Sequence, residues 1–165
     1  MPPAASSEVA AAVADAHRRE WAFVLAATVR VAGDIDTAEE AVQDAYASAL
    51  STWGPRGIPK NPGAWLTVTA RRRALDMHRR AVTAQRALPK LFDPEEYAED
   101  EPGRDSEDIA DDRLRLIFTC CHPALALDAQ VALTLRLLCG LSTADVARAF
   151  LLPEATMAAR ITRAK

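Results

Sequence analysis

The sequence lacks the long apolar runs and β-branched segments that membrane spans and sheets require. No stretch approaches the roughly 20 consecutive apolar residues of a transmembrane helix, and the start, MPPAASSEVAAAVADAHRR, lacks the basic-then-apolar layout of a secretory signal. Aromatic residues make up only 5% of the chain, whereas alanine, leucine and arginine are abundant. Because these three residues favour helices, we expect an all-α protein, and the missing signal and span predict a cytoplasmic location.

Motifs for catalysis and metal binding are also missing. The sequence has no glycine-rich phosphate loop and no paired catalytic carboxylates, so we predict that the protein is not an enzyme and needs no cofactor. Cys120, Cys121, His122 and the later Cys139 leave a small zinc or thiol enzyme as a rival hypothesis. Adjacent helical residues point about 100° apart, however, and no C-x-x-C pair is present, so core packing is the better account. We expect no metal, and an odd number of cysteines suits a reducing compartment.

Charge is strongly segregated along the chain although the net charge is only −3. Residues 93–112 contain eleven acids and one arginine, a net of −10. Residues 71–90 contain seven bases and one acid, a net of +6. A single short segment therefore contains most of the basic excess, which suits a contact with nucleic acid that the overall charge conceals.

Apolar residues at helical spacing predict two helices in the first third of the chain. Residues 1–7 show no such pattern, and we expect them to be disordered. A first amphipathic helix then ends at Gly33, a residue type common at helix C-termini. Asp36 and Glu39 are spaced as a capping box, and an apolar stripe continues from there to Trp53.

A third helix is predicted after the glycine- and proline-rich stretch WGPRGIPKNP. Asn61 and Pro62 suit the N-cap and the first turn, and the helix is expected to end at about Arg80. One side of it is apolar, comprising Leu66, Ala70, Ala74 and Met77. The other side is charged, comprising Arg72, Arg73, Asp76, Arg79 and Arg80.

Residues 81–110 are predicted to form an acidic linker, because their composition cannot bury enough apolar surface to offset the entropy of ordering. A second helical unit is predicted from about Asp111, with a break at Pro123 and a further helix that ends before Gly140. Its expected apolar residues are Leu114, Ile117 and Phe118 in the first helix and Val131, Leu135 and Leu138 in the next.

The end of the chain has helix-turn-helix spacing. Ser142 suits the N-cap of a short helix that ends at Phe150, and a final helix is expected from Glu154. Leu151 occupies the turn position where glycine is usual. On the final helix, Met157, Ile161 and Ala164 form the expected buried stripe, and Thr156, Arg160 and Arg163 share an outward face that can reach a DNA major groove. The alternative is an αα-hairpin of an ordinary helical bundle with surface arginines.

Three segments, in order, resemble the extracytoplasmic-function group (group IV) of the sigma-70 family, and together they cover nearly the whole chain. GDIDTAEEAVQDAYASAL at 33–50 is similar to the helix that binds the clamp of the largest core RNA polymerase subunits. NPGAWLTVTARRRALDMHRR at 61–80 is similar to the helix that recognises and opens the promoter minus-ten element, and residues 141–165 are similar to the minus-35 recognition helices.

The resemblance implies three sets of contact residues. The polymerase-binding set is Asp36, Glu39, Glu40, Gln43 and Asp44. The minus-ten set is Lys60 and Asn61, in the loop expected to bind a flipped base, with Trp65, Arg72, Arg73, Arg79 and Arg80. The minus-35 set is Glu154, Thr156, Arg160 and Arg163, although Ala158 and Ala159 stand where the family has polar or basic residues.

We therefore predict two small helical domains, 8–80 and 111–165, joined by an acidic linker at 81–110. RLIFTCCHPAL at 115–125 is similar to a subgroup with a long tetratricopeptide-like C-terminal extension. We expect that this chain lacks the extension and that its second domain is truncated.

The implied function is that of a sigma factor directing promoter recognition and transcription initiation. The implied partners are the clamp and flap regions of core RNA polymerase and promoter DNA, and the implied regulator is either the missing extension or an anti-sigma factor. The alternative is a helix-turn-helix regulator that acts without polymerase. Such a regulator would need no acidic helix at 36–44 and would bind DNA as a dimer.

Overall fold

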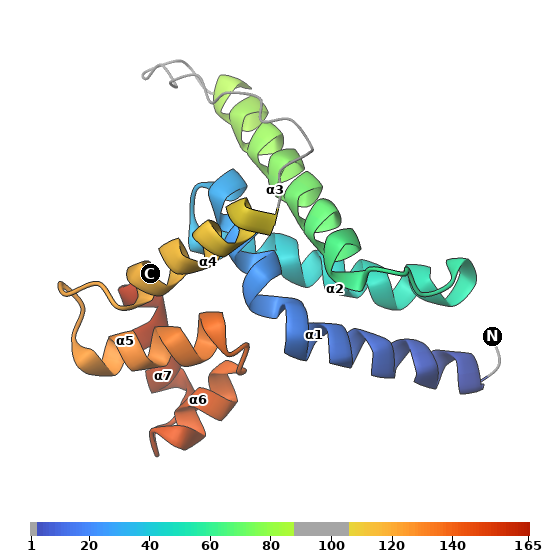
Figure 1. Ribbon diagram of the computed structural model, residues 1–165. Coiled ribbons are helices and arrows are strands. Elements are labelled where there is room, and N and C mark those ends of the chain that lie inside the picture. Colours follow the sequence, from blue (N-terminus) through green and yellow to red (C-terminus); the bar gives the residue numbers. More distant parts are fainter. Residues whose placement is uncertain (1–2, 88–105) are drawn as a thin grey trace.

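The structure, a computed structural model, describes residues 3–87 and 106–165, and it contains no strand within those ranges. The predicted all-α fold is confirmed. The first half consists of three long helices that pack against one another, α1 (Pro3–Ala32), α2 (Ile35–Arg56) and α3 (Pro62–Ala87). The second half consists of α4 (Ser106–Cys120), α5 (Leu127–Leu133), the π-helical turn η1 (Thr134–Leu138), α6 (Thr143–Ala149) and α7 (Glu154–Ala164) (Figure 1). Among the described helices, none is both long enough and apolar enough to cross a membrane.

The two N-terminal helices differ from the prediction at their starts. α1 begins at Pro3, so residues 3–7 are helical rather than disordered. Proline is favoured in the first turn because it has no N–H to leave unpaired, and the alanines that follow favour the helix. The N-cap of α2 is Asp34, whose Oδ1 accepts a hydrogen bond of 2.8 Å from the backbone N of Thr37. The predicted capping box of Asp36 and Glu39 is therefore wrong, and both side chains contact other groups.

Glycines end α1 and α2 as their positions suggest. Gly33 has a φ of +81° and its N donates to Val29 O over 2.9 Å, which confirms the predicted end of α1. α2 continues past the predicted end at Trp53, passes through Pro55 and stops before Gly57, whose φ is +84°. Both glycines adopt backbone angles that residues with a Cβ rarely adopt.

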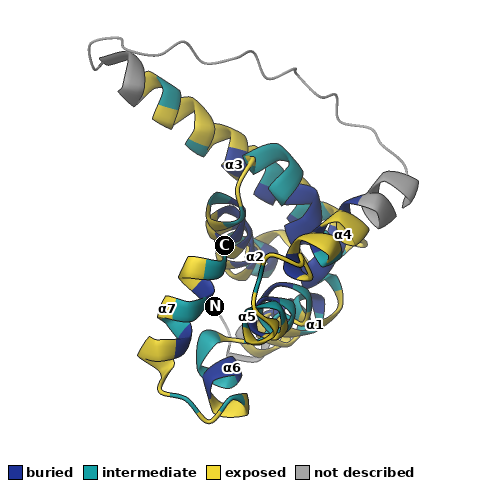
Figure 2. Ribbon diagram, turned by 90° about the vertical axis from the view of Figure 1, so that its left-hand side faces the viewer, coloured by how far each residue is buried: buried dark blue, intermediate teal, exposed yellow. Residues whose placement is uncertain are grey.

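α3 begins as predicted and extends further than predicted. Asn61 is its N-cap, with Oδ1 accepting a 3.0 Å hydrogen bond from the N of Ala64. The helix continues beyond Arg80 to Ala87, and its C-terminal half extends away from the other helices (Figure 2). The predicted inner side is confirmed, since Leu66, Ala70 and Ala74 are fully buried and Met77 is half-buried. Much of the outer half of α3 is therefore left to solvent.

The predicted core of the second half is only partly correct, since Leu135 and Leu138 are half-buried against the core but the most deeply buried residues are different ones. On α4, Leu116 and Cys120 are buried, whereas Leu114 and Phe118 are 51% and 71% exposed. On α5 and η1, Leu133 and Leu137 are buried and Val131 is 42% exposed. The segment VALTLRLL is apolar on every side, so its periodicity alone cannot identify the buried face. α4 also begins at Ser106, before the predicted start, and residues 88–105 of the predicted linker lie outside the described residues.

α6 and α7 form the predicted helix-turn-helix. Ser142 is the N-cap of α6, and its Oγ accepts a 3.1 Å hydrogen bond from the N of Asp145. Ala147 is buried in α6, and Met157 and Ile161 are buried in α7. Leu151 occupies the turn with a φ of +53° and a 92% exposed side chain. The turn thus places a leucine in the left-handed conformation for which glycine is usually selected.

Candidate functional site

The acidic residues at the start of α2 divide between two faces of the helix. Glu40 and Asp44 are exposed and lie four residues apart on one face. Asp36, Glu39 and Gln43 lie on the adjacent face, which is turned toward the second half of the chain. On the second face only Glu39 is buried, whereas the Asp36 side chain is 70% exposed and Gln43 is also exposed.

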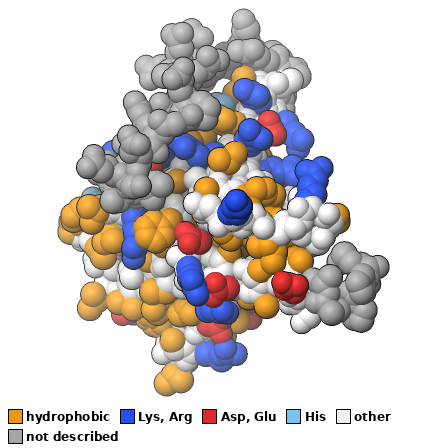
Figure 3. Space-filling model, turned by 45° about the vertical axis from the view of Figure 1, so that its right-hand side comes forward, with side chains coloured by type: hydrophobic (Ala, Val, Ile, Leu, Met, Phe, Trp, Pro, Cys, Tyr) orange, Lys and Arg blue, Asp and Glu red, His pale blue; other side chains and the backbone are white. Residues whose placement is uncertain are grey.

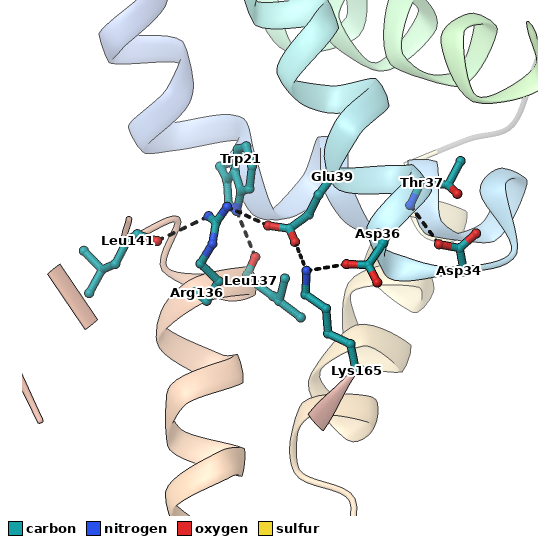
Figure 4. A network of polar contacts seen from close by, with 9 residues as sticks. All are labelled: Trp21, Asp34, Asp36, Thr37, Glu39, Arg136, Leu137, Leu141 and Lys165. Atoms are coloured by element: carbon teal, nitrogen blue, oxygen red, sulfur yellow. Dashed lines mark hydrogen bonds and ion pairs between the residues drawn. The ribbon is translucent and has the colours of Figure 1, made fainter. Parts of the chain in front are cut away.

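Glu39 is the centre of an ionic network that joins the two halves of the chain (Figure 4). Its side chain is 6% exposed and lies between two cations from the second half. Arg136 Nη2 lies 2.8 Å from Glu39 Oε1, and Lys165 Nζ hydrogen-bonds both to Glu39 Oε2 and, over 2.7 Å, to Asp36 Oδ1. Removing one partner of a buried ion pair commonly costs about 3–5 kcal/mol, because the remaining charge stays buried without compensation.

The pKa of Lys165 reflects this network. Burial of the ammonium group lowers the pKa, but its hydrogen bonds to Asp36 and Glu39 outweigh that effect and raise it. A lysine whose folded-state pKa is raised stabilises the fold at every pH below its ordinary value and loses that contribution only in strong alkali. The Lys165 contact is therefore fully formed at neutral pH.

Aromatic side chains surround the same contact. The indole Nε1 of Trp21 donates a 3.0 Å hydrogen bond to the backbone O of Leu137, and the Arg136 guanidinium lies 5.7 Å from the Trp21 ring centroid. His17 and Tyr46 stack beside Trp21, with ring centroids 4.8 Å and 6.1 Å from it. Burial, and then the charge of Arg136, lower the pKa of His17. A neutral His17 imidazole is thus favoured at this contact.

A cleft of about 510 Å³ lies between the two halves of the chain beside this cluster. It is lined by Gln43 of the predicted polymerase-binding set, by the aromatic residues of α1 and α2, and by residues at the start of α6. The second half therefore covers one face of α2 without filling all the space against it.

The arginines of α3 form an exposed basic surface. The side chains of Arg72, Arg73, Arg79 and Arg80 make no ion pair with any other residue that the structure describes. Blue side chains gather in the upper part of the face in Figure 3, where Figure 1 places α3. Exposed arginine side chains of this kind can contact phosphate groups.

Trp65 and Asn61 lie at the N-terminal end of this basic surface. Trp65 is seven residues before Arg72, which is two helical turns, so both residues lie on the same side of α3. The Trp65 ring is half-buried and packs edge to face on buried Trp53, with centroids 5.6 Å apart and an interplanar angle of 73°. Lys60 is exposed, and the Asn61 side-chain oxygen is already used by the helix cap. A base can therefore stack only on the outer part of the Trp65 ring.

The predicted minus-35 set is only partly outward-facing. Glu154, Thr156 and Arg163 are exposed on α7, and Arg163 Nε donates to Ala159 O over 3.2 Å. Arg160 is instead half-buried, with Nη1 3.2 Å from Asp128 Oδ2 and its guanidinium 6.0 Å from the Phe150 ring centroid. Reaching DNA would require Arg160 to leave these contacts.

The cysteines do not form a metal site in the described part of the chain, where no group of three or more His, Cys, Asp or Glu side chains is placed to bind a metal. Cys120 is fully buried in the core, as predicted, whereas Cys121 and Cys139 are exposed. Burial, and then the neighbouring Cys121, raise the pKa of the Cys120 thiol to about 11. Thiolate chemistry at Cys120 is therefore disfavoured at neutral pH.

We expect only two of the three thiols to react rapidly in the native protein. At pH 8 a thiol-specific chromogenic reagent should modify Cys121 and Cys139 quickly and Cys120 only after denaturation, because the thiolate is the reactive form and Cys120 is both buried and protonated. Cys120→Ser should leave the rapid phase unchanged. A rapid phase of three thiols would contradict the burial of Cys120.

Sequence patterns did not identify the residues that join the two halves. Glu39 contacts Arg136, and Trp21 contacts the segment that includes Leu137 and Gly140. The partners in each contact are more than 90 residues apart in the sequence, so only the fold brings them together. No local signal in the sequence distinguishes Arg136 from an ordinary surface arginine. A π-helical turn at the position of Arg136 is the structural sign of an unusual site there.

Comparison with known proteins identifies both halves of the chain. Residues 15–83 match sigma-70 region 2, and residues 115–165 match sigma-70 region 4. The chain is also similar to an uncharacterized protein of Rhizobium meliloti (strain 1021), with 43% identity over 149 residues, which cover 86% of this chain and 34% of the relative. The chain thus spans about a third of the length of that relative. The two helical halves of the structure thus correspond to region 2 and region 4, in that order along the chain. The chain belongs to the extracytoplasmic-function group of the sigma-70 family.

Proposed function

We propose that the protein is an RNA polymerase sigma factor that directs promoter recognition and transcription initiation and catalyses no reaction itself. The region 2 domain binds core polymerase through α2 and the minus-ten strand through α3, and the region 4 domain binds the minus-35 duplex through α7. The observation that carries the proposal is that one region 2 domain presents acidic residues on α2 and, on the adjacent α3, exposed arginines that pair with none of the described residues. Because polymerase is cytoplasmic, the proposed function implies that location.

The two surfaces suit two different partners at the same time. Carboxylates such as Glu40 and Asp44 repel DNA phosphates, so α2 favours a basic protein surface such as a polymerase clamp. The α3 surface from Trp65 to Arg80 is about 22 Å long at about 1.5 Å per residue, which is enough for several nucleotides. Stacking on an aromatic ring contributes about 1–3 kcal/mol per base, comparable to the few kcal/mol needed to unstack a base step.

Binding to bacterial core RNA polymerase tests the proposal directly. We expect the wild-type chain to co-elute with core polymerase on size-exclusion chromatography, and Asp44→Arg to weaken the complex at least about tenfold, because it places a like charge against a basic clamp. Glu8→Arg is the matched control, since it makes the same charge reversal at an exposed position of α1. It should bind as the wild type does.

Failure to bind would favour the regulator that acts without polymerase. A folded wild-type chain that does not co-elute, but that binds duplex DNA as a dimer, would contradict the sigma-factor proposal. Equal weakening by Asp44→Arg and Glu8→Arg would show that net charge rather than the α2 surface governs binding.

A further inference from the structure

We infer that the region 4 domain of the free protein competes with core polymerase for one face of α2, so that the domains must separate before polymerase can bind fully. This inference rests on the proposed function and adds a means of controlling it. Three of the five residues predicted to contact polymerase, Asp36, Glu39 and Gln43, face the region 4 domain. Arg136 and Lys165 of that domain contact buried Glu39, whereas Asp36 and Gln43 remain exposed. A polymerase clamp that needs Glu39 cannot reach its buried side chain while the domains are docked.

The docked arrangement depends on complementary groups from both domains. The carboxylates of Asp36 and Glu39 meet the cations of Lys165 and Arg136, and the Trp21 indole meets the backbone O of Leu137. Gly140 approaches so closely that an added Cβ would lie 3.1 Å from the Trp21 ring. A second ion pair, between Arg30 of α1 and Asp112 of α4, spans 3.8 Å beside the same interface. The contact is therefore specific in shape and in charge.

Such a contact is strong enough to persist and weak enough to open. Buried ion pairs gain little net free energy over their hydrated, separated groups, so most of the charge interaction is recovered by water or by a new partner. The domains belong to one chain, however, so their docking is intramolecular, which favours even a weak contact. A basic clamp supplies cations to Asp36 and Glu39 in place of Arg136 and Lys165, so polymerase binding itself favours opening.

The predicted consequence is a lowered affinity of the free chain for polymerase. When only a fraction of molecules is competent to bind, the apparent Kd rises by the reciprocal of that fraction. A competent state populated at about one-tenth or less would weaken binding about tenfold or more. Removing the region 4 cations should recover that factor without changing any residue of α2.

The experiment uses the full chain with Arg136→Ala and Lys165→Ala combined. We expect this variant to have a larger radius of gyration by small-angle X-ray scattering and to bind core polymerase about tenfold more tightly than the wild type. The matched control is Arg115→Ala with Arg148→Ala, which removes two exposed arginines from the same half of the chain that do not contact α2. The control should match the wild type in both measurements.

Two results would overturn the inference. One is a larger radius of gyration with unchanged affinity, which would show that docking does not obstruct polymerase. The other is no change in either quantity, which would show that these cations do not maintain docking. If circular dichroism shows that the double variant is unfolded, Lys165→Ala alone is used in its place, because it leaves the contacts of Arg136 with Glu39 and Leu141 intact. This single variant should still bind polymerase more tightly than the wild type. An unchanged affinity would count against the inference. Absence of polymerase binding by every folded variant would instead contradict the proposed function.

Discussion

Replacing Gly140 with alanine should lower the free energy of unfolding by about 2–5 kcal/mol. Gly140 has a φ of +70°, where a residue with a Cβ costs about 1–2 kcal/mol. The new Cβ would also lie 3.1 Å from Cγ and Cδ1 of Trp21 and 3.3 Å from Cε1 of His17. Overpacking of this kind adds about 1–3 kcal/mol when the neighbours cannot move.

Trp21 is poorly able to yield to the added methyl group. Its ring is 4% exposed, stacks with Tyr46 and donates a 3.0 Å hydrogen bond to Leu137 O. Moving the ring would break that bond, so the two domains would have to shift apart instead. We therefore expect Gly140→Ala to change the docking of the domains as well as the stability.

Gly33→Ala is the matched control for this prediction. Gly33 has a similar φ of +81°, but an added Cβ meets no atom within 4 Å. Its substitution should cost only the backbone term of about 1–2 kcal/mol. Urea unfolding followed by far-ultraviolet circular dichroism gives both values, and an equal loss for the two variants would show that the contact with Trp21 contributes nothing.

Local signals predicted the elements of this fold well. The cap residues Asn61 and Ser142 and the helix-ending Gly33 were identified because each acts through backbone groups only a few residues away. The spacing of Asp36 and Glu39 fits a capping box and predicts Asp36 as the N-cap, but Asp34 offers the same chemistry two residues earlier. Spacing alone could not distinguish the two aspartates.

The errors in the core have a different physical origin. α4 and η1 both pack against α1, α4 also packs against α5, and the sequences of these segments are apolar on more than one side. Which side is buried depends on the partner helix, and periodicity contains no information about partners. For the same reason Val131 was predicted to be buried and is exposed, whereas Leu133 and Leu137 are buried.

The candidate site was predicted in part, for a related reason. The exposed arginines of α3 follow from helical spacing, because their role requires only that one side of a single helix face solvent. Glu39 lies in the predicted polymerase-binding helix, but its burial against Arg136 depends on how two domains dock. The docking brings together residues about 100 positions apart, and no motif in either segment encodes it.

Neutralising the arginines of α3 should produce the largest loss of DNA binding. We expect a chain with Arg72, Arg73, Arg79 and Arg80 all replaced by glutamine to bind a single-stranded oligonucleotide at least about a hundredfold more weakly. Charge-assisted hydrogen bonds contribute roughly 1.5 kcal/mol each, and the loss of two of the four is enough for that factor. None of the four arginines makes an ion pair with a described residue, so the substitutions should leave the fold intact.

The salt dependence of binding distinguishes phosphate contacts from a general charge effect. Each phosphate contact to a single strand contributes about −0.7 to the slope of log K against log salt concentration, so losing four contacts should make the slope shallower by about 3. Fluorescence anisotropy with a labelled oligonucleotide at several salt concentrations measures that slope.

Arg18→Gln with Arg19→Gln is the control, since both arginines are exposed on α1 and pair with Asp15 rather than extending along α3. This control removes two charges, so it is compared with Arg72→Gln and Arg79→Gln, which should make the slope shallower by about 1.4. If both double variants change the slope equally, the α3 arginines act only through net charge. A change confined to the α3 variant would instead mean that α3 contacts the strand, because the release of counterions depends on which phosphates are contacted.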